Sequence, residues 1–182
     1  MKKLFCLFIF FVVVLSTSAQ SIGSFLDFYL GQPISEVKKI TNSKYPTASW
    51  DEKICTIQNV RIAGELFTKL YLRFDNNILT TGDFSLRQRI PIDISFDYEA
   101  ASSFLNNCTS HDADVASRLY ALYVEKYGKE TYNTGKTIVW RGADGKSIKL
   151  EFKSEFVNIE GGYLGGAELQ LKYEMSSVLG NY

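Results

Sequence analysis

Residues 66–79 read LFTKLYLRFDNNIL, and this stretch gives the clearest indication of the fold. Leu70, Leu72 and Phe74 alternate with polar or charged neighbours, which is the two-residue period of a strand with one buried face. Asn76-Asn77 then provides a two-residue turn, because asparagine tolerates a positive φ. The stretch therefore predicts a β-hairpin that buries one of its faces.

Similar alternation recurs along the chain and predicts further strands. Even-numbered apolar residues continue through 90–96, which predicts one long bent strand or two shorter ones. Asp144-Gly145 predicts another hairpin turn. The predicted strands cover residues 55–62, 66–75, 78–87, 137–141, 147–153 and 167–174.

Helices are predicted before each run of strands. Ser35 is a good N-cap for the first helix, and the Lys-Tyr-Pro sequence at 44–46 should end it. A short helical piece over 98–105 and a polar segment over 106–114 precede a second, strongly amphipathic helix. Gly128 is a suitable C-terminal stop for that helix.

Each half of the chain thus contains a helix, a Lys-Tyr pair and an antiparallel run of strands. The expected fold is α+β, with two tandem helix-plus-antiparallel-sheet units whose helices pack on one face of the sheet. The expected units are residues 20–107 and 108–175. They follow a signal peptide at 1–19 and precede a loose tail at 176–182.

Two segments resemble a known group of cell-envelope proteins: residues 31–37 (GQPISEV) at the first helix and 70–79 (LYLRFDNNIL) at the hairpin. Their order resembles the β-lactamase-inhibitor-protein-like fold and the small outer-membrane-assembly lipoproteins of the SmpA/OmlA type. Residues 31–87 fit best, and residues 113–174 fit more loosely. The resemblance implies a sheet packed on helices that binds other envelope proteins through the sheet or its loops. This chain lacks the anchoring cysteine of the lipoprotein branch.

The N-terminus predicts export. Lys2 and Lys3 precede an apolar run at 4–15 and the small residues at 16–19, as in a secretory signal peptide cleaved after Ala19. A run of about a dozen apolar residues is shorter than the roughly 20 that span a bilayer as a helix. We therefore expect a secreted or periplasmic protein without a transmembrane anchor after cleavage.

Charge and cysteine content limit the classes of partner. Loss of Lys2 and Lys3 leaves 18 basic against 20 acidic side chains, a net charge of −2, so no nucleic-acid partner is expected. Cys55 and Cys108 either form a disulfide or are separate core thiols. Neither cysteine has a second Cys at metal-ligand spacing, so no metal or other cofactor is expected.

Aromatic residues indicate a binding surface. The chain has 11 tyrosines, and tyrosine and arginine are enriched at protein interfaces. Strand alternation places Tyr71, Arg73 and Arg141 opposite the inferred core, while Tyr163 lies in a glycine-rich segment expected to be a loop or bulge that carries it outward. The function expected from this pattern is non-enzymatic binding of a protein or peptide.

Two alternatives come from other functional classes. His111, the only histidine, could act as a general base with Asp112 or Asp114 in a hydrolase. The structural interpretation is that Ser110 or Asp112 caps the second helix. The many aromatic residues also suit a small-ligand carrier with a cavity between helices and sheet. The sequence pattern sets no oligomeric state.

Overall fold

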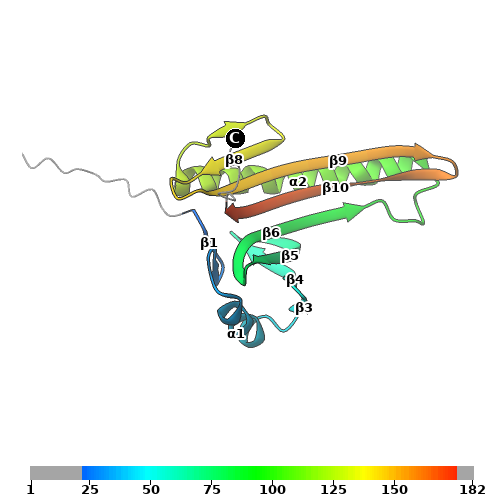
Figure 1. Cartoon of the computed structure of the whole chain (residues 1–182). Helices are drawn as coiled ribbons and strands as arrows, with labels where there is room; N and C mark the ends of the chain where they lie inside the picture. Colours follow the sequence, from blue (N-terminus) through cyan, green and yellow to red (C-terminus); the bar gives the residue numbers. More distant parts are fainter. Residues whose placement is uncertain (1–21, 176–182) are drawn as a thin grey trace, which may run out of the picture.

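The computed structural model describes residues 22–175, so the expected signal peptide at 1–19 and the expected tail at 176–182 lie outside the described residues. Two helices accompany a large antiparallel sheet, as the α+β expectation requires (Figure 1). A separate two-stranded ribbon, β1 (Ser24–Phe25) and β2 (Phe28–Tyr29), precedes them.

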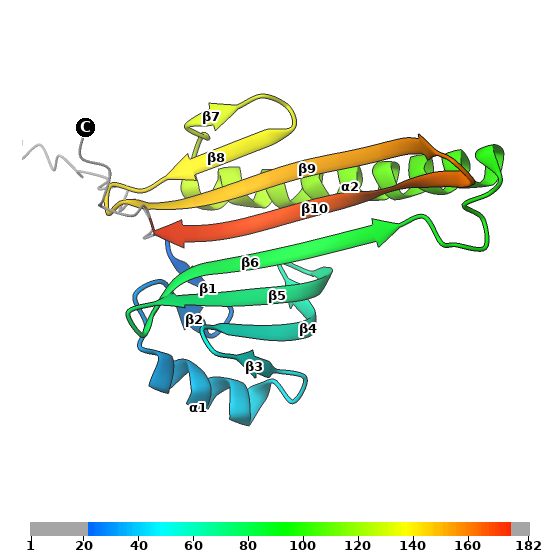
Figure 2. The same ribbon diagram turned by 45° about the vertical axis from the view of Figure 1, so that its right-hand side comes forward.

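The large sheet has eight strands in the order β3-β4-β5-β6-β10-β9-β8-β7. The last strands of two successive runs, β6 and β10, therefore pair in its middle (Figure 2). In chain order the helices and strands are α1 (Ile34–Lys44), β3 (Ser49–Asp51), β4 (Ile54–Ile62), β5 (Glu65–Asp75), β6 (Ile78–Arg89), α2 (Tyr98–Tyr127), β7 (Tyr132–Asn133), β8 (Thr137–Arg141), β9 (Lys146–Ile159) and β10 (Gly162–Met175).

Both predicted hairpin turns are confirmed. Asn76 and Asn77 adopt φ values of 49° and 62° between β5 and β6. Gly145 has a φ of 74° between β8 and β9. Positive φ at these positions suits asparagine and glycine, so local chemistry sets the register of both hairpins.

The core lies on one face of the sheet. Leu119 of α2 and Val37 of α1 belong to the same buried cluster as the β1–β2 residues Phe25 and Phe28. Trp140 of β8 points into this core and is 1% exposed. Burying a large apolar side chain stabilises a fold by about 1.5–3 kcal/mol. One cross-strand row of this face contains Cys55, Leu72, Gly82, Tyr173, Ile148 and Trp140.

The first helix starts earlier than its sequence indicates. Pro33, not Ser35, occupies the N-cap position, and no side chain caps the helix there. Proline suits this place because its missing N–H needs no partner at a helix start. The predicted end is correct, since the helix stops at Lys44 and the N–H of Tyr45 donates to the carbonyl of Thr41.

The second helix is continuous, whereas the sequence predicted a break over 106–114. It runs for 30 residues, and the side chain of Asp97, rather than Ser110 or Asp112, accepts the N-cap hydrogen bonds. Its buried positions in this region are Cys108 and Asp112. Because neither is a large apolar residue, the apolar periodicity that marks a helix in the sequence is missing there. The boundary predicted between residues 107 and 108 lies inside this helix.

The strand predicted over 90–96 does not form. β6 ends at Arg89, and a series of turns leads to α2. Ile92 and Phe96 are 79% and 71% exposed, so their alternation does not mark a buried face. Apolar alternation predicts a strand only where a neighbouring element covers one side.

The glycine-rich segment 161–166, predicted as a flexible loop or bulge, is mostly strand. β9 and β10 extend beyond the predicted limits and pair from Ile159 and Gly162 onward. A Cβ at Gly165 would lie 2.1 Å from the carbonyl oxygen of Glu155, and one at Gly166 would lie 2.2 Å from that of Gln88. These glycines therefore permit close approach of neighbouring strands.

Candidate functional site

The face of the large sheet opposite the core, called here the open face, carries polar and charged side chains. Its central row crosses five adjacent strands, from β5 to β8. Along the strand registers this row contains Tyr71, Asp83, Lys172, Lys149 and Val139. The alternation of each strand thus places a continuous polar surface opposite the core.

Two of the predicted binding residues lie together on this face. The guanidinium carbon of Arg73 is 5.7 Å from the centroid of the Tyr71 ring. The ammonium nitrogen of Lys69 lies 6.0 Å from the same centroid. Tyr71 therefore attracts both cations to its ring.

The third predicted residue, Arg141, shares the open face but lies far from Tyr71. Arg73 and Arg141 occupy one cross-strand row, separated by Thr81, Glu174 and Ser147 on three intervening strands. Four strand spacings of about 4.8 Å place their backbones about 19 Å apart. A partner contacting both would have to cover most of the sheet's width.

Tyr163 lies on the other face and is separate from these residues. It belongs to β10 opposite Asn158, rather than to a loop. Its ring stacks on that of Phe156 at 5.4 Å with an interplanar angle of 5°. Its ring also meets Tyr98 of α2 edge-on at 5.4 Å. The prediction that Tyr163 projects from a loop is therefore wrong.

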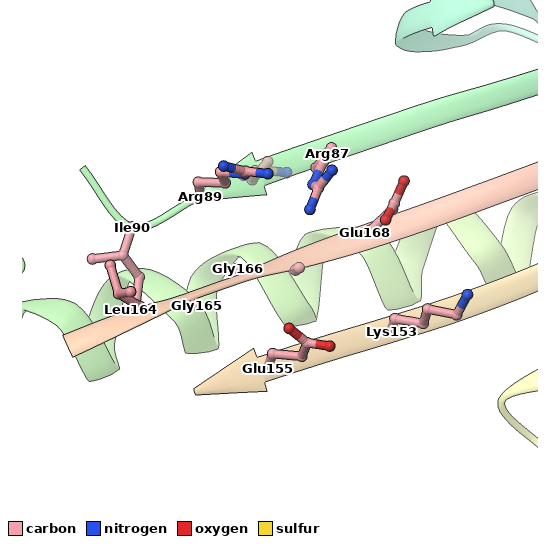
Figure 3. Close-up of a pocket in the computed structure, with 11 residues that line it drawn as sticks. Arg87, Arg89, Ile90, Lys153, Glu155, Leu164, Gly165, Gly166 and Glu168 are labelled. Carbon is pink, nitrogen blue, oxygen red and sulfur yellow. The ribbon is translucent and has the colours of Figure 1, made fainter. Parts of the chain in front are cut away.

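A cleft of about 380 Å³ occupies the part of the open face near the β9–β10 turn. Arg87 of β6 faces Glu168 across the strand pair, and Arg89 faces Gly166. Glu155 of β9 lies beyond Gly166. Figure 3 shows the arginines on one side of the cleft and the β9 side chains on the other, with glycine between them. The absence of a side chain at Gly166 contributes to the hollow.

The arginines of the open face form no ion pairs within the described residues. Four of the chain's six arginines lie on this face, and within residues 22–175 none of the four makes an ion pair. Lysines on the same face do form ion pairs, since the Nζ atoms of Lys149 and Lys153 each lie 3.0 Å from Oε2 of Glu151. The unpaired arginines are Arg73, Arg87, Arg89 and Arg141.

No protein-family model, curated protein or solved structure matches this chain. The resemblance to β-lactamase-inhibitor-protein-like and SmpA/OmlA-type modules stays a prediction.

Asp83, in the central row, adds a buried acceptor to the arginine-rich face. Its Oδ2 atom accepts a 3.0 Å hydrogen bond from Nε2 of Gln170, whereas Oδ1 has no partner within the described chain. Burial raises the pKa of this carboxyl, against the opposing effect of the Gln170 hydrogen bond.

His111 lies within α2, and its side chain is 59% exposed. Its Nδ1 atom is 3.4 Å from Oδ1 of Asp112, while Asp114 is exposed. Oδ1 of Asp112 also accepts from Gln88, and burial raises the pKa of Asp112. The structure therefore brings His111 to Asp112 on the helix, and neither residue lines the cleft near the β9–β10 turn.

A second cleft, of about 770 Å³, lies between the β1–β2 ribbon, the β4–β5 turn and α2. At its base the hydroxyls of Tyr123 and Tyr173 form a hydrogen bond. Both tyrosines are buried, so each hydroxyl relies on the other for a partner. The rest of the lining combines apolar side chains with polar and charged ones: Phe25, Leu26, Ile62, Ala63 and Leu122 with Ser24, Glu125 and Lys126.

Cys55 and Cys108 are both free and buried, so the structure contains no disulfide between them. They lie on different elements: Cys55 on β4, and Cys108 on α2, which packs mainly against β10 and β9. Burial raises the pKa of the Cys55 thiol to about 11 and also raises that of Cys108.

Two further properties concern the described segment alone. Neither of its helices combines the length and apolar character needed to cross a membrane. Over residues 22–175 no group of three or more His, Cys, Asp or Glu side chains is arranged to hold a metal ion.

The sequence did not predict the residues of the cleft near the β9–β10 turn, which we call the charged cleft. Continued alternation from Phe84 and Leu86 placed Arg87 and Arg89 outward, so a signal for them existed. The pairing of β6 with β10 was the missing information, because it joins segments far apart in the sequence.

Proposed function

We propose that this chain is a non-enzymatic binding module that recognises a protein or peptide with its open face, in the periplasm or outside the cell. The supporting observation is the concentration of unpaired arginines on that face. Arginine presents a planar fork of donors that matches carboxylates, and it is weakly hydrated compared with an ammonium group. The partner's contact segment is accordingly rich in Asp and Glu.

The contacts around Tyr71 and Asp83 support the same surface. Tyr71 holds the Arg73 guanidinium beside its ring, which lowers the entropy lost when a carboxylate binds it. Asp83 lies directly opposite Tyr71 in the central row and places a carboxyl group among the cations of the face. A surface with both features selects its partner by the arrangement of charge and not by net charge alone.

The architecture of the proposed module is a pair of tandem helix-plus-sheet units. A helix followed by four antiparallel strands occurs twice in the order of elements. Val37 of α1 and Leu119 of α2 belong to one hydrophobic cluster, which favours helices on a single face of the sheet. In this arrangement the other face, with its arginines, is left for a partner.

Partner capture tests the proposal. A chain beginning at Gln20 serves as bait for proteins of the cell envelope and culture medium. Replacing all four open-face arginines by Gln should abolish capture, because their carboxylate contacts are lost. The matched control replaces four exposed lysines elsewhere, Lys39, Lys53, Lys129 and Lys136, by Gln and changes the net charge equally. Equal losses in both variants would reject the open face as the binding surface.

A small-ligand carrier is the second candidate, and the cleft of about 770 Å³ favours it. The apolar side chains of its lining and the Tyr123–Tyr173 pair suit a largely apolar ligand with one polar group. Native mass spectrometry should then detect a bound molecule, and Leu122→Arg should release it. The same bound mass in this variant would place the ligand elsewhere.

A further inference from the structure

The end of the β9–β10 ribbon exposes more large apolar side chains than the rest of the sheet. Figure 2 shows this ribbon and the start of α2 extending past the ends of β4 and β5. We call residues 90–99 and 154–165 the distal tip. Its exposed apolar side chains are Ile92, Phe96, Tyr98, Phe156, Val157, Ile159 and Leu164.

Six of these side chains, all except Ile92, gather around the end of the β9–β10 ribbon. Val157 and Leu164 are cross-strand partners, 50% and 55% exposed. On the opposite side of the ribbon the Phe156 ring lies 5.9 Å from that of Tyr98. A Cβ at Gly162 would lie 3.4 Å from the Phe96 ring, so Phe96 packs beside the turn. The apolar surface therefore wraps around the tip.

Backbone hydrogen bonds hold the two segments of the tip together. The N–H of Tyr163 donates to the carbonyl of Ser95 at 2.6 Å, and the N–H of Ile90 donates to the carbonyl of Gly165 at 3.1 Å. Ser95 is buried although it lies in a turn. The exposed apolar residues are thus presented by a hydrogen-bonded scaffold, which reduces the entropy lost on docking.

The charge of the tip has a single sign. The sequences IPIDISFDYE (90–99) and SEFVNIEGGYLG (154–165) contain five carboxylates and no lysine or arginine. Connected exposed apolar patches mark docking sites, and the surrounding charge selects what can approach. Anionic lipid headgroups would be repelled by such a surface, because membrane-binding surfaces carry Lys and Arg.

We propose that the distal tip docks onto a protein partner whose contact surface has an apolar centre bordered by lysine and arginine. The apolar side chains of the tip supply the buried area, and the carboxylates pair with the basic border. Glu155 and Leu164 of the tip also line the charged cleft of the open face, so the two surfaces adjoin there. The other exposed residues of the tip lie outside that cleft and are apolar or acidic. The inference therefore does not depend on the proposed function.

A defined probe tests this chemistry. The labelled probe is a synthetic amphipathic helical peptide of leucine and lysine, and a leucine–glutamate peptide of equal length is its control. Fluorescence anisotropy should show binding of the lysine peptide only. Ile92→Ser combined with Phe96→Ser should weaken binding at least tenfold, because two anchors of the apolar centre are lost. Asp93→Asn with Glu160→Gln, which removes exposed carboxylates outside the charged cleft, should weaken it and reduce its salt dependence.

Matched variants distinguish the tip from general effects. Leu26→Ser with Leu66→Ser removes exposed leucines elsewhere, and Asp51→Asn with Glu52→Gln removes exposed acids at the β3–β4 turn. Both controls should bind like the wild type, with circular dichroism verifying the fold of every variant. Equal weakening by the controls, or equal binding of the two peptides, would overturn the proposal.

Two other kinds of binding partner for the tip, a lipid surface and a second copy of the chain, would give distinct results. Co-sedimentation with phosphatidylcholine vesicles that the tip substitutions abolish would assign the tip to a lipid surface. Self-association in analytical ultracentrifugation that the same substitutions abolish would assign it to a second copy. Either result would overturn docking onto a basic-bordered partner. Loss of tip binding with intact open-face capture would leave the proposed function standing, and the reverse result would leave the tip proposal standing.

Discussion

Gln88 of β6 donates a hydrogen bond from Nε2 to Oδ1 of Asp112 on α2, across 3.3 Å. Asp112 is fully buried, and its Oδ2 atom has no partner in the described chain. A buried carboxylate favours its neutral form, so burial raises the pKa of Asp112 above its ordinary value of 3.8. This contact therefore connects helix and sheet through a group whose ionisation opposes folding.

Asp112→Asn should change how stability depends on pH. The raised pKa means that the folded chain retains this proton at pH values where the unfolded chain has lost it. The resulting stabilisation is complete below the unfolded pKa and is lost as pH rises through the folded pKa. Urea unfolding should therefore show the stability of the variant increasing relative to that of the wild type as the pH rises above 3.8, the ordinary pKa of the carboxyl. A pH-independent difference would contradict the assignment.

Gly82→Ala should displace the β1–β2 ribbon. A Cβ at Gly82 would lie 2.1 Å from Cζ of Phe25, so the aromatic ring occupies the place of a side chain. We expect a loss of about 1–3 kcal/mol in the free energy of unfolding, as for other overpacked cores. In a Phe25→Ala background the substitution should cost much less, because the ring is gone. Additive effects in urea titrations would show that the two residues do not compete for space.

Tyr123→Phe should leave the hydroxyl of Tyr173 buried without its partner. The two hydroxyls are hydrogen-bonded, and Tyr123 and Tyr173 are 6% and 2% exposed. An orphaned buried hydroxyl costs about 1–3 kcal/mol. Replacing both tyrosines by Phe should cost less than the sum of the single substitutions, as measured by thermal unfolding. If the cost of the double substitution equalled the sum of the two single costs, the hydroxyls would have other hydrogen-bond partners.

Cys55 and Cys108 should not react in the native protein. Both thiols are buried, and the pKa of Cys55 is about 11, so little thiolate is available near neutral pH. For a chain beginning at Gln20, Ellman's reagent should modify both thiols in urea and neither in buffer. A reducing agent should leave the unfolding midpoint unchanged. A lowered midpoint under reduction would instead reveal a disulfide.

Features set by neighbouring residues could be predicted from the sequence. The turns at Asn76-Asn77 and Asp144-Gly145 depend on the φ preferences of those residues, and the flanking strands followed from alternation. Tyr71, Arg73 and Arg141 were placed on the open face by the same rule. These predictions need no knowledge of which distant strands pair.

Features that depend on distant segments escaped prediction. The continuity of α2 was hidden because Cys108 and Asp112 occupy buried positions where apolar residues were sought. Gly165 and Gly166 were assigned to a loop, although backbone proximity to β9 and β6 explains them. The charged cleft arises where β6 meets β10, so its residues share no local motif.

The central position of β10 has a consequence for biosynthesis. This strand, the last of the described chain, lies between β6 and β9, and both earlier strands lack a partner on that side until it is made. A nascent chain consequently keeps two unprotected strand edges until β10 has been synthesised. Deleting β10 would therefore split the sheet in two rather than trim it.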